Sequence, residues 1–254
     1  MGILPRRKRA PGPVSAVYAI VLAGGKGERL RPFTEDRPKP MVEIMGVPIL
    51  GYHLQWLQAQ GITDVVLACG YRHEVIESHF NNGERLGLRI TYAVEKEPLG
   101  RGGALREALS RIPDTVDAVI ATNGDVITNL PLAPLLAAHR SRRMQATLVL
   151  TPFVSQYGIV EVDEADRVTQ FREKPELPYW INAGVYALSP SIREELPERG
   201  DHEATTFPGL AAAGRLGAHK IRAFWRTVDT IKDVNEVSSE FQRRVLSPFR
   251  ARGR

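Results

Sequence analysis

The sequence predicts an α/β fold with a mixed, mainly parallel central sheet, helices on both faces and a small antiparallel sheet on the substrate side. Two features of the 254 residues support this prediction. As far as residue 153, apolar segments of strand length alternate with helical segments, which implies parallel strands joined by right-handed crossovers. After residue 153, closely spaced strand patterns with turn residues between them are typical of antiparallel pairing.

The part before residue 153 is predicted to alternate strictly. The first strand, over 17–23, is an apolar run that Gly24 and Gly25 break. A helix follows over 49–61, because its apolar residues recur on one helical face and Gly61 can end it. The later elements are a strand at 64–70, a helix at 72–80, a strand at 89–94, a helix at 102–112, a strand at 117–125, a helix at 132–142 and a strand at 145–153.

The part after residue 153 is predicted to hold a hairpin, with strands over 158–163 and 167–174. Further strands are expected at 181–189 and 219–224, with short helices between them and a closing helix over 230–244. This gives one Rossmann-like domain over 16–240, with an N-terminal half (about 16–153) and a C-terminal half (about 154–240). Open α/β sheets bind ligands at the carboxyl ends of their strands, so the two halves are expected to share a cleft there.

The composition excludes several classes of protein. With 43% hydrophobic and 25% charged residues, the chain is typical of globular proteins. No apolar run approaches the ~18 residues of a membrane span, and no secretory signal pattern is visible, so no membrane partner is expected. The single cysteine, Cys69, cannot form an internal disulfide, which favours a cytoplasmic location.

The net charge of +5 is located mainly at the two ends. The run "RRKR" near the N-terminus contributes +4, and residues 240–254, with five arginines and Glu240, contribute another +4, which leaves a net charge of −3 for residues 16–239. We therefore predict basic, disordered tails at 1–15 and 241–254. No nucleic-acid partner is expected; contact of the tails with nucleic acid, an anionic surface or a partner chain stays as the alternative.

The stretch "LAGGKGERLRPFTEDRPKP" predicts a phosphate site. Gly24, Gly25 and Gly27 let backbone N–H groups approach an anion. The positive charge that a triphosphate requires is supplied by four basic residues: Arg29, Arg31, Arg37 and Lys39. The stretch lacks the G-K-[ST] ending of a P-loop and the third glycine of the dinucleotide fingerprint, which disfavours an oxidoreductase.

This stretch resembles the signature of the sugar-1-phosphate nucleotidylyltransferases. The resemblance continues through "EPLGRGGAL", "NGD", "YGIVEVD", "REKP" and "INAGVYAL", in family order over about residues 16–240. It implies transfer of a nucleotidyl group from a nucleoside triphosphate to a sugar 1-phosphate, which gives an NDP-sugar and pyrophosphate. The N-terminal half (about 16–153) is then expected to be the nucleotide half and the C-terminal half (about 154–240) the sugar-phosphate half.

The resemblance also implies the site residues. The catalytic set is Arg29, Lys39, Asp125, Lys174 and Asp229. The nucleotide-binding set is Leu22, Ala23, Gly24, Gly25, Gly27, Glu97, Gly102 and Gly124. The sugar-phosphate-binding set is Tyr157, Gly158, Glu173, Lys174 and Asn182.

Two acids are expected to hold Mg²⁺, which prefers oxygen ligands. Asp125 in "NGD" follows a strand; standing alone it would be interpreted as a turn, and the resemblance makes it a metal ligand. Most relatives carry W-x-D near the C-terminal end, whereas here Thr227 stands two places after Trp225 and the acid is Asp229. The glucose-1-phosphate cytidylyltransferases resemble this spacing, so Asp229 is predicted as the second ligand, while its rival Asp233 is expected to cap a helix.

The choice of substrates is the least constrained prediction. Glu97 is expected at the base edge, where a carboxylate suits the two adjacent donors of guanine or the amino group of cytosine. Several motifs resemble mannose- or heptose-1-phosphate guanylyltransferases, so guanylyl transfer to mannose 1-phosphate comes first, cytidylyl transfer to glucose 1-phosphate second, and thymidylyl or uridylyl transfer third.

Another phosphate acceptor, such as phosphocholine, and a catalytically silent regulatory paralogue stay as alternatives. The oligomeric state is left open, with a homo-oligomer as one option.

Overall fold

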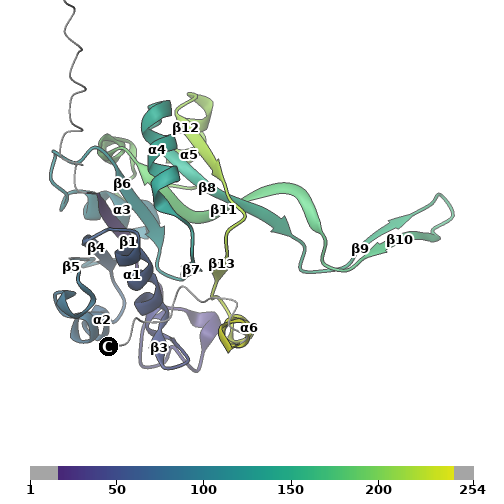
Figure 1. Cartoon of the computed structure of the whole chain (residues 1–254), viewed down its shortest axis with the longest axis horizontal. Helices are drawn as coiled ribbons and strands as arrows, with labels where there is room; N and C mark the ends of the chain where they lie inside the picture. Colours follow the sequence, from purple (N-terminus) through teal and green to yellow (C-terminus); the bar gives the residue numbers. More distant parts are fainter. Residues whose placement is uncertain (1–16, 243–254) are drawn as a thin grey trace, which may run out of the picture.

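The computed structural model describes residues 17–242 (Figure 1). The predicted tail at 1–15 and all but the first two residues of the tail at 241–254 lie outside this range. A seven-stranded sheet in the order β12-β8-β11-β6-β1-β4-β5 forms the centre. Its strands are β1 (Tyr18–Leu22), β4 (Asp64–Cys69), β5 (Arg89–Val94), β6 (Val119–Asn123), β8 (Ala146–Val154), β11 (Glu176–Leu188) and β12 (Leu216–Lys220).

The sheet is mixed and mainly parallel, as predicted. Strand β1 pairs in parallel with β4 on one side and with β6 on the other, and β4 pairs in parallel with β5. Strand β11 is antiparallel to both of its neighbours, β6 and β8, whereas β12 is again parallel to β8. The parallel group therefore places the carboxyl ends of β1, β4, β5 and β6 at one edge of the sheet.

Helices cover both faces of the sheet, because successive residues of the buried strands point to opposite sides. On one face, Val65 and Leu67 of β4 pack with residues of three helices: α1 (Ile49–Ala59), α2 (His73–Phe80) and α4 (Leu132–Arg142). On the other face, Val66 packs with residues of α3 (Gly100–Leu109) and α5 (Thr206–Ala212). The last helix, α6 (Ile231–Gln242), packs on a third core with Ile44 and Ile49. Four short 3₁₀ helices complete the helical elements: η1 (Glu28–Leu30), η2 (Lys39–Met41), η3 (Glu84–Leu86) and η4 (Pro190–Glu195). Within residues 17–242, no helix combines the length and hydropathy needed to cross a membrane.

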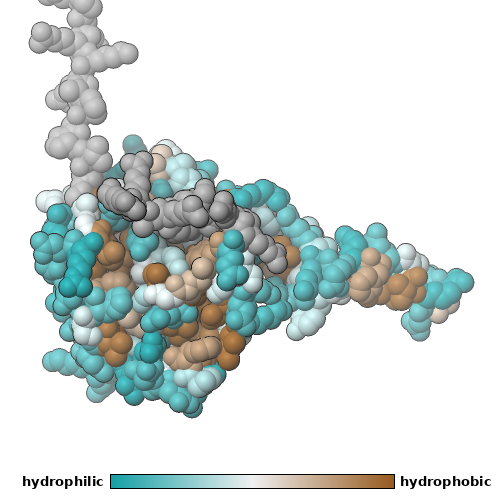
Figure 2. Space-filling model, turned by 60° about the horizontal axis from the view of Figure 1, so that its bottom comes forward, coloured by the Kyte–Doolittle hydropathy of each residue, from teal (hydrophilic) through white to brown (hydrophobic). Residues whose placement is uncertain are grey.

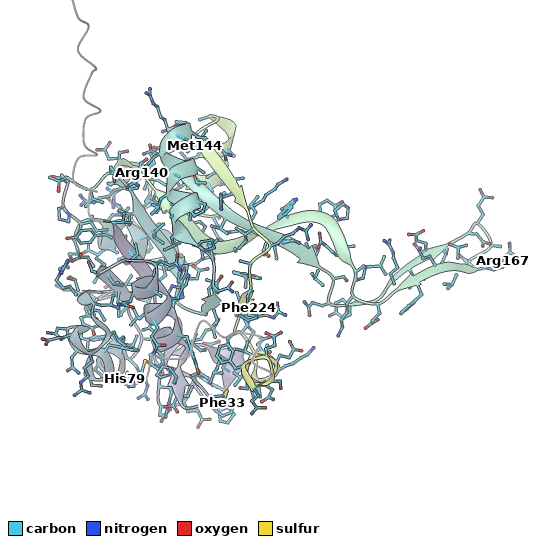
Figure 3. All side chains as sticks on the ribbon, in the orientation of Figure 1. Phe33, His79, Arg140, Met144, Arg167 and Phe224 are labelled. Atoms are coloured by element: carbon cyan, nitrogen blue, oxygen red, sulfur yellow. The ribbon has the colours of Figure 1, made fainter. Side chains whose placement is uncertain are left out.

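The predicted hairpin is confirmed and extends away from the body (Figure 1). Within residues 17–242, its strands, β9 (Ile159–Val162) and β10 (Val168–Arg172), pair only with each other. We call residues 155–175 the arm; it connects the end of β8 to the start of β11, and Arg167 lies near its tip (Figure 3). Apolar side chains, including Val162 and Phe171, are exposed along it (Figure 2). Two other small sheets pair β13 (Trp225–Thr227) with β7 (Val126–Thr128) and β2 (Glu43–Ile44) with β3 (Val47–Pro48).

Two predicted strands differ from the structure. The strand predicted at 219–224 is wrong: β12 covers 216–220, and the chain leaves β8 after the N–H of Ile221 bonds to Leu150. The sequence pattern does not indicate a strand that begins at residue 216, because Gly217 has low strand propensity. The strand predicted at 181–189 starts earlier, at Glu176, because β11 follows β8 as far as the pair Glu176–Val154.

Candidate active site

A cavity of about 590 Å³ opens at the carboxyl edge of the parallel strands, a volume typical of small-molecule sites. It forms where the predicted phosphate loop, the segment after β5 and the segments around β7 and β13 converge. The predicted site residues that line it are Leu22, Gly24, Gly25, Arg29, Lys39, Asp125 and Asp229.

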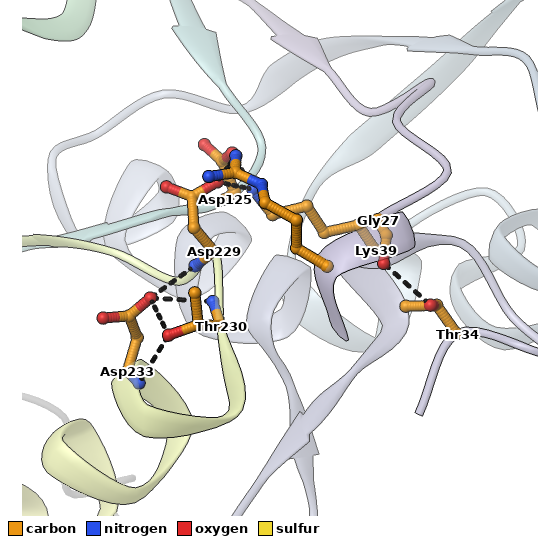
Figure 4. A network of polar contacts seen from close by, with 8 residues as sticks. Gly27, Thr34, Lys39, Asp125, Asp229, Thr230 and Asp233 are labelled. Carbon is orange, nitrogen blue, oxygen red and sulfur yellow. Dashed lines mark hydrogen bonds and ion pairs between the residues drawn. The ribbon is translucent and has the colours of Figure 1, made fainter. Parts of the chain in front are cut away.

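Four of these residues form one cluster of charges (Figure 4). The ammonium Nζ of Lys39 lies 2.5 Å from Oδ2 of Asp125 and 2.8 Å from Oδ1 of Asp229. Arg29 donates to the same oxygen of Asp229, at 2.8 Å. The structure therefore brings together, in one crevice, residues that lie up to 200 positions apart in the sequence.

Lys39 and Asp229 are both held in their charged forms. Burial lowers the pKa of Lys39, but the carboxylates of Asp125 and Asp229 outweigh this effect, and the net shift is upward. Burial alone would raise the pKa of Asp229. The hydrogen bond and charge of Lys39, together with the charge of Arg29, outweigh burial, so the net shift of this pKa is downward. Both residues are consequently ionised at neutral pH, and the side chain of Lys39 is only 12% exposed.

The local backbone explains why Lys39 reaches the carboxylates. Gly27 has a φ of +69°, a conformation that favours glycine, and a Cβ there would lie only 2.7 Å from Cβ of Lys39. The N–H of Lys39 donates to the carbonyl of Gly25 at 3.1 Å, which fixes the second half of the loop against the first. Pro38 and Pro40 flank Lys39 and restrict the chain further.

The structure separates the two rival acids before α6. Oδ2 of Asp233 accepts hydrogen bonds from the backbone N–H groups of Asp229 (2.9 Å) and Thr230 (2.7 Å) and from the hydroxyl of Thr230 (2.9 Å). Asp233 therefore stabilises the start of the helix, as predicted. Asp229 is the acid that faces the cavity (Figure 4).

The donor set fits a divalent metal that binds together with a nucleotide. Oδ1 of Asp125 is buried and has no hydrogen-bond partner among the described residues, so it can accept a further cation. No group of three or more histidine, cysteine or acidic side chains within 17–242 has the arrangement of a metal site. A metal held by Asp125 and Asp229 alone needs further oxygen ligands from water and phosphate, which is the usual coordination of Mg²⁺.

Three predicted nucleotide residues lie elsewhere. Glu97 forms an ion pair with Arg199 at 2.8 Å, its side chain is 72% exposed, and it is not part of the cavity lining. The N–H of Gly102 donates to the carbonyl of Gly200, and that of Gly124 donates to Leu22. Both glycines allow close backbone packing around the site, and a role in nucleotide binding stays a prediction for all three residues. Ala23 and Gly27 belong to the same segment but are not among the residues that line the cavity.

Sequence reasoning missed Glu95, which lines the cavity directly after β5. Its Oε2 accepts the N–H of Leu99 at 3.0 Å, and its carboxylate lies beside the backbone of Gly24 and Gly70. Burial raises the pKa of Glu95 and outweighs the lowering effect of the bond from Leu99. The sequence offered a usable signal, because Glu95 is the first residue after a predicted strand and therefore lies at the ligand-binding edge.

The predicted sugar-phosphate residues are not brought into the cavity. Tyr157 is 79% exposed, and Gly158, Glu173 and Lys174 lie with it at the base of the arm. A Cβ on Gly158 would lie 2.6 Å from the ring of Phe171, so this glycine allows the two strands of the arm to approach. Among the described residues, the ammonium of Lys174 has no ion-pair partner.

Asn182 is connected to the cavity indirectly. Its amide donates to Oε1 of Glu203 at 2.8 Å and to the hydroxyl of Tyr186 at 3.0 Å. Glu203 pairs with Arg101 at 2.8 Å, and Arg101, which also bonds to Asp201, lines the cavity. The network thus ends at Arg101, a third positive side chain of the cavity wall beside Arg29 and Lys39, which the sequence prediction did not include.

Comparison with known proteins gives concordant matches. The sequence model described as "Nucleotidyl transferase" matches residues 18–244. The mannose-1-phosphate guanylyltransferase of Mycobacterium tuberculosis is 37% identical over 245 residues, 93% of this chain and 68% of that protein. The probable mannose-1-phosphate guanylyltransferase 1 of Oryza sativa is 37% identical over 85% of this chain, and the chain spans 62% of its length. The crystal structure of HddC from Yersinia pseudotuberculosis complexed with GMP-PN superposes with a TM-score of 0.70 at 25% identity, over 88% of this chain and 99% of that one. The chain therefore spans about two thirds of the length of these two guanylyltransferases and nearly the whole length of the HddC chain.

Proposed function

The chain belongs to the nucleotidyl transferase family, and we propose that it transfers GMP from GTP to mannose 1-phosphate or a related sugar 1-phosphate. A phosphate oxygen of the sugar 1-phosphate attacks the α-phosphorus of GTP, and the bond from that phosphorus to the oxygen bridging to the β-phosphate breaks. The electron pair of that bond leaves with pyrophosphate, and the product is a GDP-sugar. The second pKa of a phosphate monoester is near 6, so the attacking group is dianionic at neutral pH and needs no base from the protein.

The observation that supports this proposal most strongly is the charge cluster at the sheet edge. Two anionic substrates must meet although they repel each other, so the site needs fixed positive charge that is already in place. Arg29 and Lys39 provide it within one cavity, next to the glycines of the phosphate loop. In the proposed reaction they bind the triphosphate and offset the charge that builds on the departing pyrophosphate.

Asp125 and Asp229 are proposed to hold Mg²⁺, the expected cofactor. When bound, the ion would act as a Lewis acid toward the phosphate oxygens. Lys39 keeps the two carboxylates aligned on one side of the cavity. The buried Oδ1 of Asp125 supplies a lone pair that no described protein donor occupies.

Glu95 is proposed to contact the base edge, and the predicted contact by Glu97 is the alternative. Its carboxylate lines the cavity, whereas Glu97 is turned to Arg199. An ionised carboxylate accepts hydrogen bonds, and guanine presents two adjacent donors in N1–H and N2–H. The guanylyltransferase names of the relatives and the GMP-PN complex of HddC support the same choice of base for this chain.

The acceptor is proposed to bind on the side of the arm and Asn182. Lys174 would pair with the phosphate of the sugar, and Glu173 would accept hydrogen bonds from sugar hydroxyls. Tyr157, Gly158 and Asn182 stay proposed contacts of the sugar. We further propose that the protein acts in the cytoplasm without a nucleic-acid partner; a homo-oligomer remains an open option.

Cytidylyl transfer to glucose 1-phosphate is the second candidate, and one observation favours it. The cavity acid is Asp229 and not an acid at position 227, which is the spacing that resembles the cytidylyltransferases. The charge cluster argues against a silent paralogue, because a chain without catalysis has no need for two partly buried carboxylates bridged by a lysine.

The test is a matrix of the four nucleoside triphosphates against mannose, glucose and heptose 1-phosphates and phosphocholine, with Mg²⁺, read as pyrophosphate release. We expect GTP with mannose or heptose 1-phosphate to give the fastest turnover. A maximum with CTP and glucose 1-phosphate would select the second candidate. Absence of pyrophosphate from every pair would reject the enzymatic proposal.

A further inference from the structure

The ammonium of Lys39 lies at the point where the two proposed metal ligands converge. Its Nζ is 2.5 Å from Asp125 and 2.8 Å from Asp229. The two acids come from different parts of the chain, one between β6 and β7 and the other just after β13, so the ammonium joins them across the edge of the cavity. A divalent ion shared by the same carboxylates would have to take the space that the ammonium now fills.

Only the outer part of the Lys39 side chain is free to move. Its backbone N–H is bonded to Gly25, and its Cβ packs against Gly27. Beyond the Cβ, the flexible stem of lysine carries a compact charge that can be turned toward another anion. The ammonium can therefore leave the carboxylates without a change in the loop.

The charges of the cluster favour such an exchange. The two positive side chains, Arg29 and Lys39, balance the two carboxylates in the free protein. A divalent ion that enters alone meets the repulsion of the ammonium at close range, in a site where Lys39 is largely buried. A triphosphate removes this obstacle, because it offers the ammonium a new partner and the metal new oxygen ligands.

We propose that Lys39 is the resident cation of the metal site: in the nucleotide-free protein its ammonium takes the place of the divalent ion between Asp125 and Asp229, and it turns to the triphosphate when metal and nucleotide bind together. The inference rests on the proposed function, because it concerns the same metal and the same triphosphate. It goes further in one respect: the free protein holds divalent ions weakly, and metal and nucleotide strengthen each other's binding.

The test measures binding of Mn²⁺ to the nucleotide-free protein, from the fraction of free Mn²⁺ seen by electron paramagnetic resonance. Lys39→Gln removes the resident charge, and we expect Mn²⁺ to bind at least about tenfold more tightly than to the wild type, because a repulsion at contact distance is lost. Lys39→Arg keeps a cation in place and is expected to bind Mn²⁺ as weakly as the wild type. Adding Asp125→Asn to Lys39→Gln is expected to remove the gain.

Thermal unfolding provides the second measurement. The neutral variants leave two carboxylates close together, so we expect Mn²⁺ to raise the Tm of Lys39→Gln and of Lys39→Met by several degrees more than that of the wild type. A neutral variant that folds only with Mn²⁺ would give the same support. Neutral variants that bind Mn²⁺ no more tightly than the wild type, or that fold neither with nor without it, would overturn the inference.

Neither measurement uses turnover, so the two proposals fail in different ways. A protein that releases no pyrophosphate with any substrate pair, but whose Lys39→Gln variant gains affinity for Mn²⁺, would contradict the proposed function and retain the cation exchange. An active enzyme without this gain would retain the function and reject the exchange.

Discussion

The charge cluster and the arm differ in how firmly the fold holds them. Asp125 follows the buried parallel strand β6, and Lys39, at the start of η2 in the segment after β1, is tied to it at 2.5 Å. The arm is a two-stranded sheet with exposed residues throughout β10, including Phe171 at 63% exposure, and it pairs with no other strand of the described chain. An isolated hairpin is marginally stable. The comparison teaches that the fold fixes the groups expected to meet the nucleotide and leaves the residues expected to meet the acceptor on a loosely supported segment.

The largest effect is expected at the cluster. Asp125→Asn removes a carboxylate proposed to hold the metal, and we expect turnover to fall by about 10²–10³-fold, the usual loss when one preorganised charge-stabilising group is removed. The measurement is pyrophosphate release under saturating substrates, with circular dichroism to confirm the fold. A loss below about threefold would show that the cluster does not carry the reaction.

Substitutions in the buried core and on the arm are also expected to differ in their effect on the free energy of unfolding. Leu54 is fully buried in the core under β1, and Leu54→Ala should lower the free energy of unfolding by about 2–5 kcal/mol. Val162 on the arm is 57% exposed, and Val162→Ala should change the free energy of unfolding by no more than about 0.5 kcal/mol. Urea unfolding of both variants makes the comparison. An equal loss for both would mean that the arm is packed against something that confers stability.

The buried region is also expected to be the source of acid sensitivity. His53 in α1 is completely buried, its Nδ1 donates to the carbonyl of Val126 at 2.8 Å, and burial lowers its pKa to about 4. Between pH 6.5 and pH 4, His53 is therefore protonated in the unfolded chain but neutral in the folded chain. The free energy of unfolding consequently falls as the pH falls through this window. We expect the wild type to lose about 2 kcal/mol more between pH 7 and pH 5 than His53→Asn. Parallel stability curves for the two proteins would contradict this cause.

A smaller and more selective effect is expected on the arm. Lys174→Ala should raise the KM for the sugar 1-phosphate by about tenfold through loss of one charge-assisted hydrogen bond, with the KM for GTP unchanged. Lys232→Ala is the matched control, because Lys232 is an exposed lysine on α6 whose partner is Glu236. If Lys174→Ala behaves like this control, the arm does not bind the acceptor phosphate.

The sequence predicted the parts of the fold that depend on local pattern. The alternation of apolar strands and amphipathic helices specifies a parallel sheet, so the residues at its carboxyl edge follow from the sequence alone. The family motifs placed Lys39, Asp125 and Asp229 in one site, and the structure brings them together at hydrogen-bond distance.

Other features depend on contacts that no local pattern contains. Glu97 and Glu95 stand two residues apart in one motif, and only the position where β5 ends decides which of them faces the cavity. Gly102 fits the sequence pattern of a ligand-binding glycine, but its N–H is taken by Gly200, nearly one hundred residues away in the chain. The direction of the arm depends on how β11 pairs with β8 as far as Glu176, which the sequence does not show.

The most direct test of the account compares two acids that are four residues apart. Asp229 faces the cavity and binds Lys39, whereas Asp233 caps α6. We expect Asp229→Asn to reduce pyrophosphate release from GTP and mannose 1-phosphate by about 10²–10³-fold at nearly unchanged stability. We expect Asp233→Asn to stay within about threefold of the wild-type rate and to lose about 1 kcal/mol of stability. Full activity in Asp229→Asn, or an equal loss in both variants, would contradict the claim that the cluster of Arg29, Lys39, Asp125 and Asp229 is the site of nucleotidyl transfer.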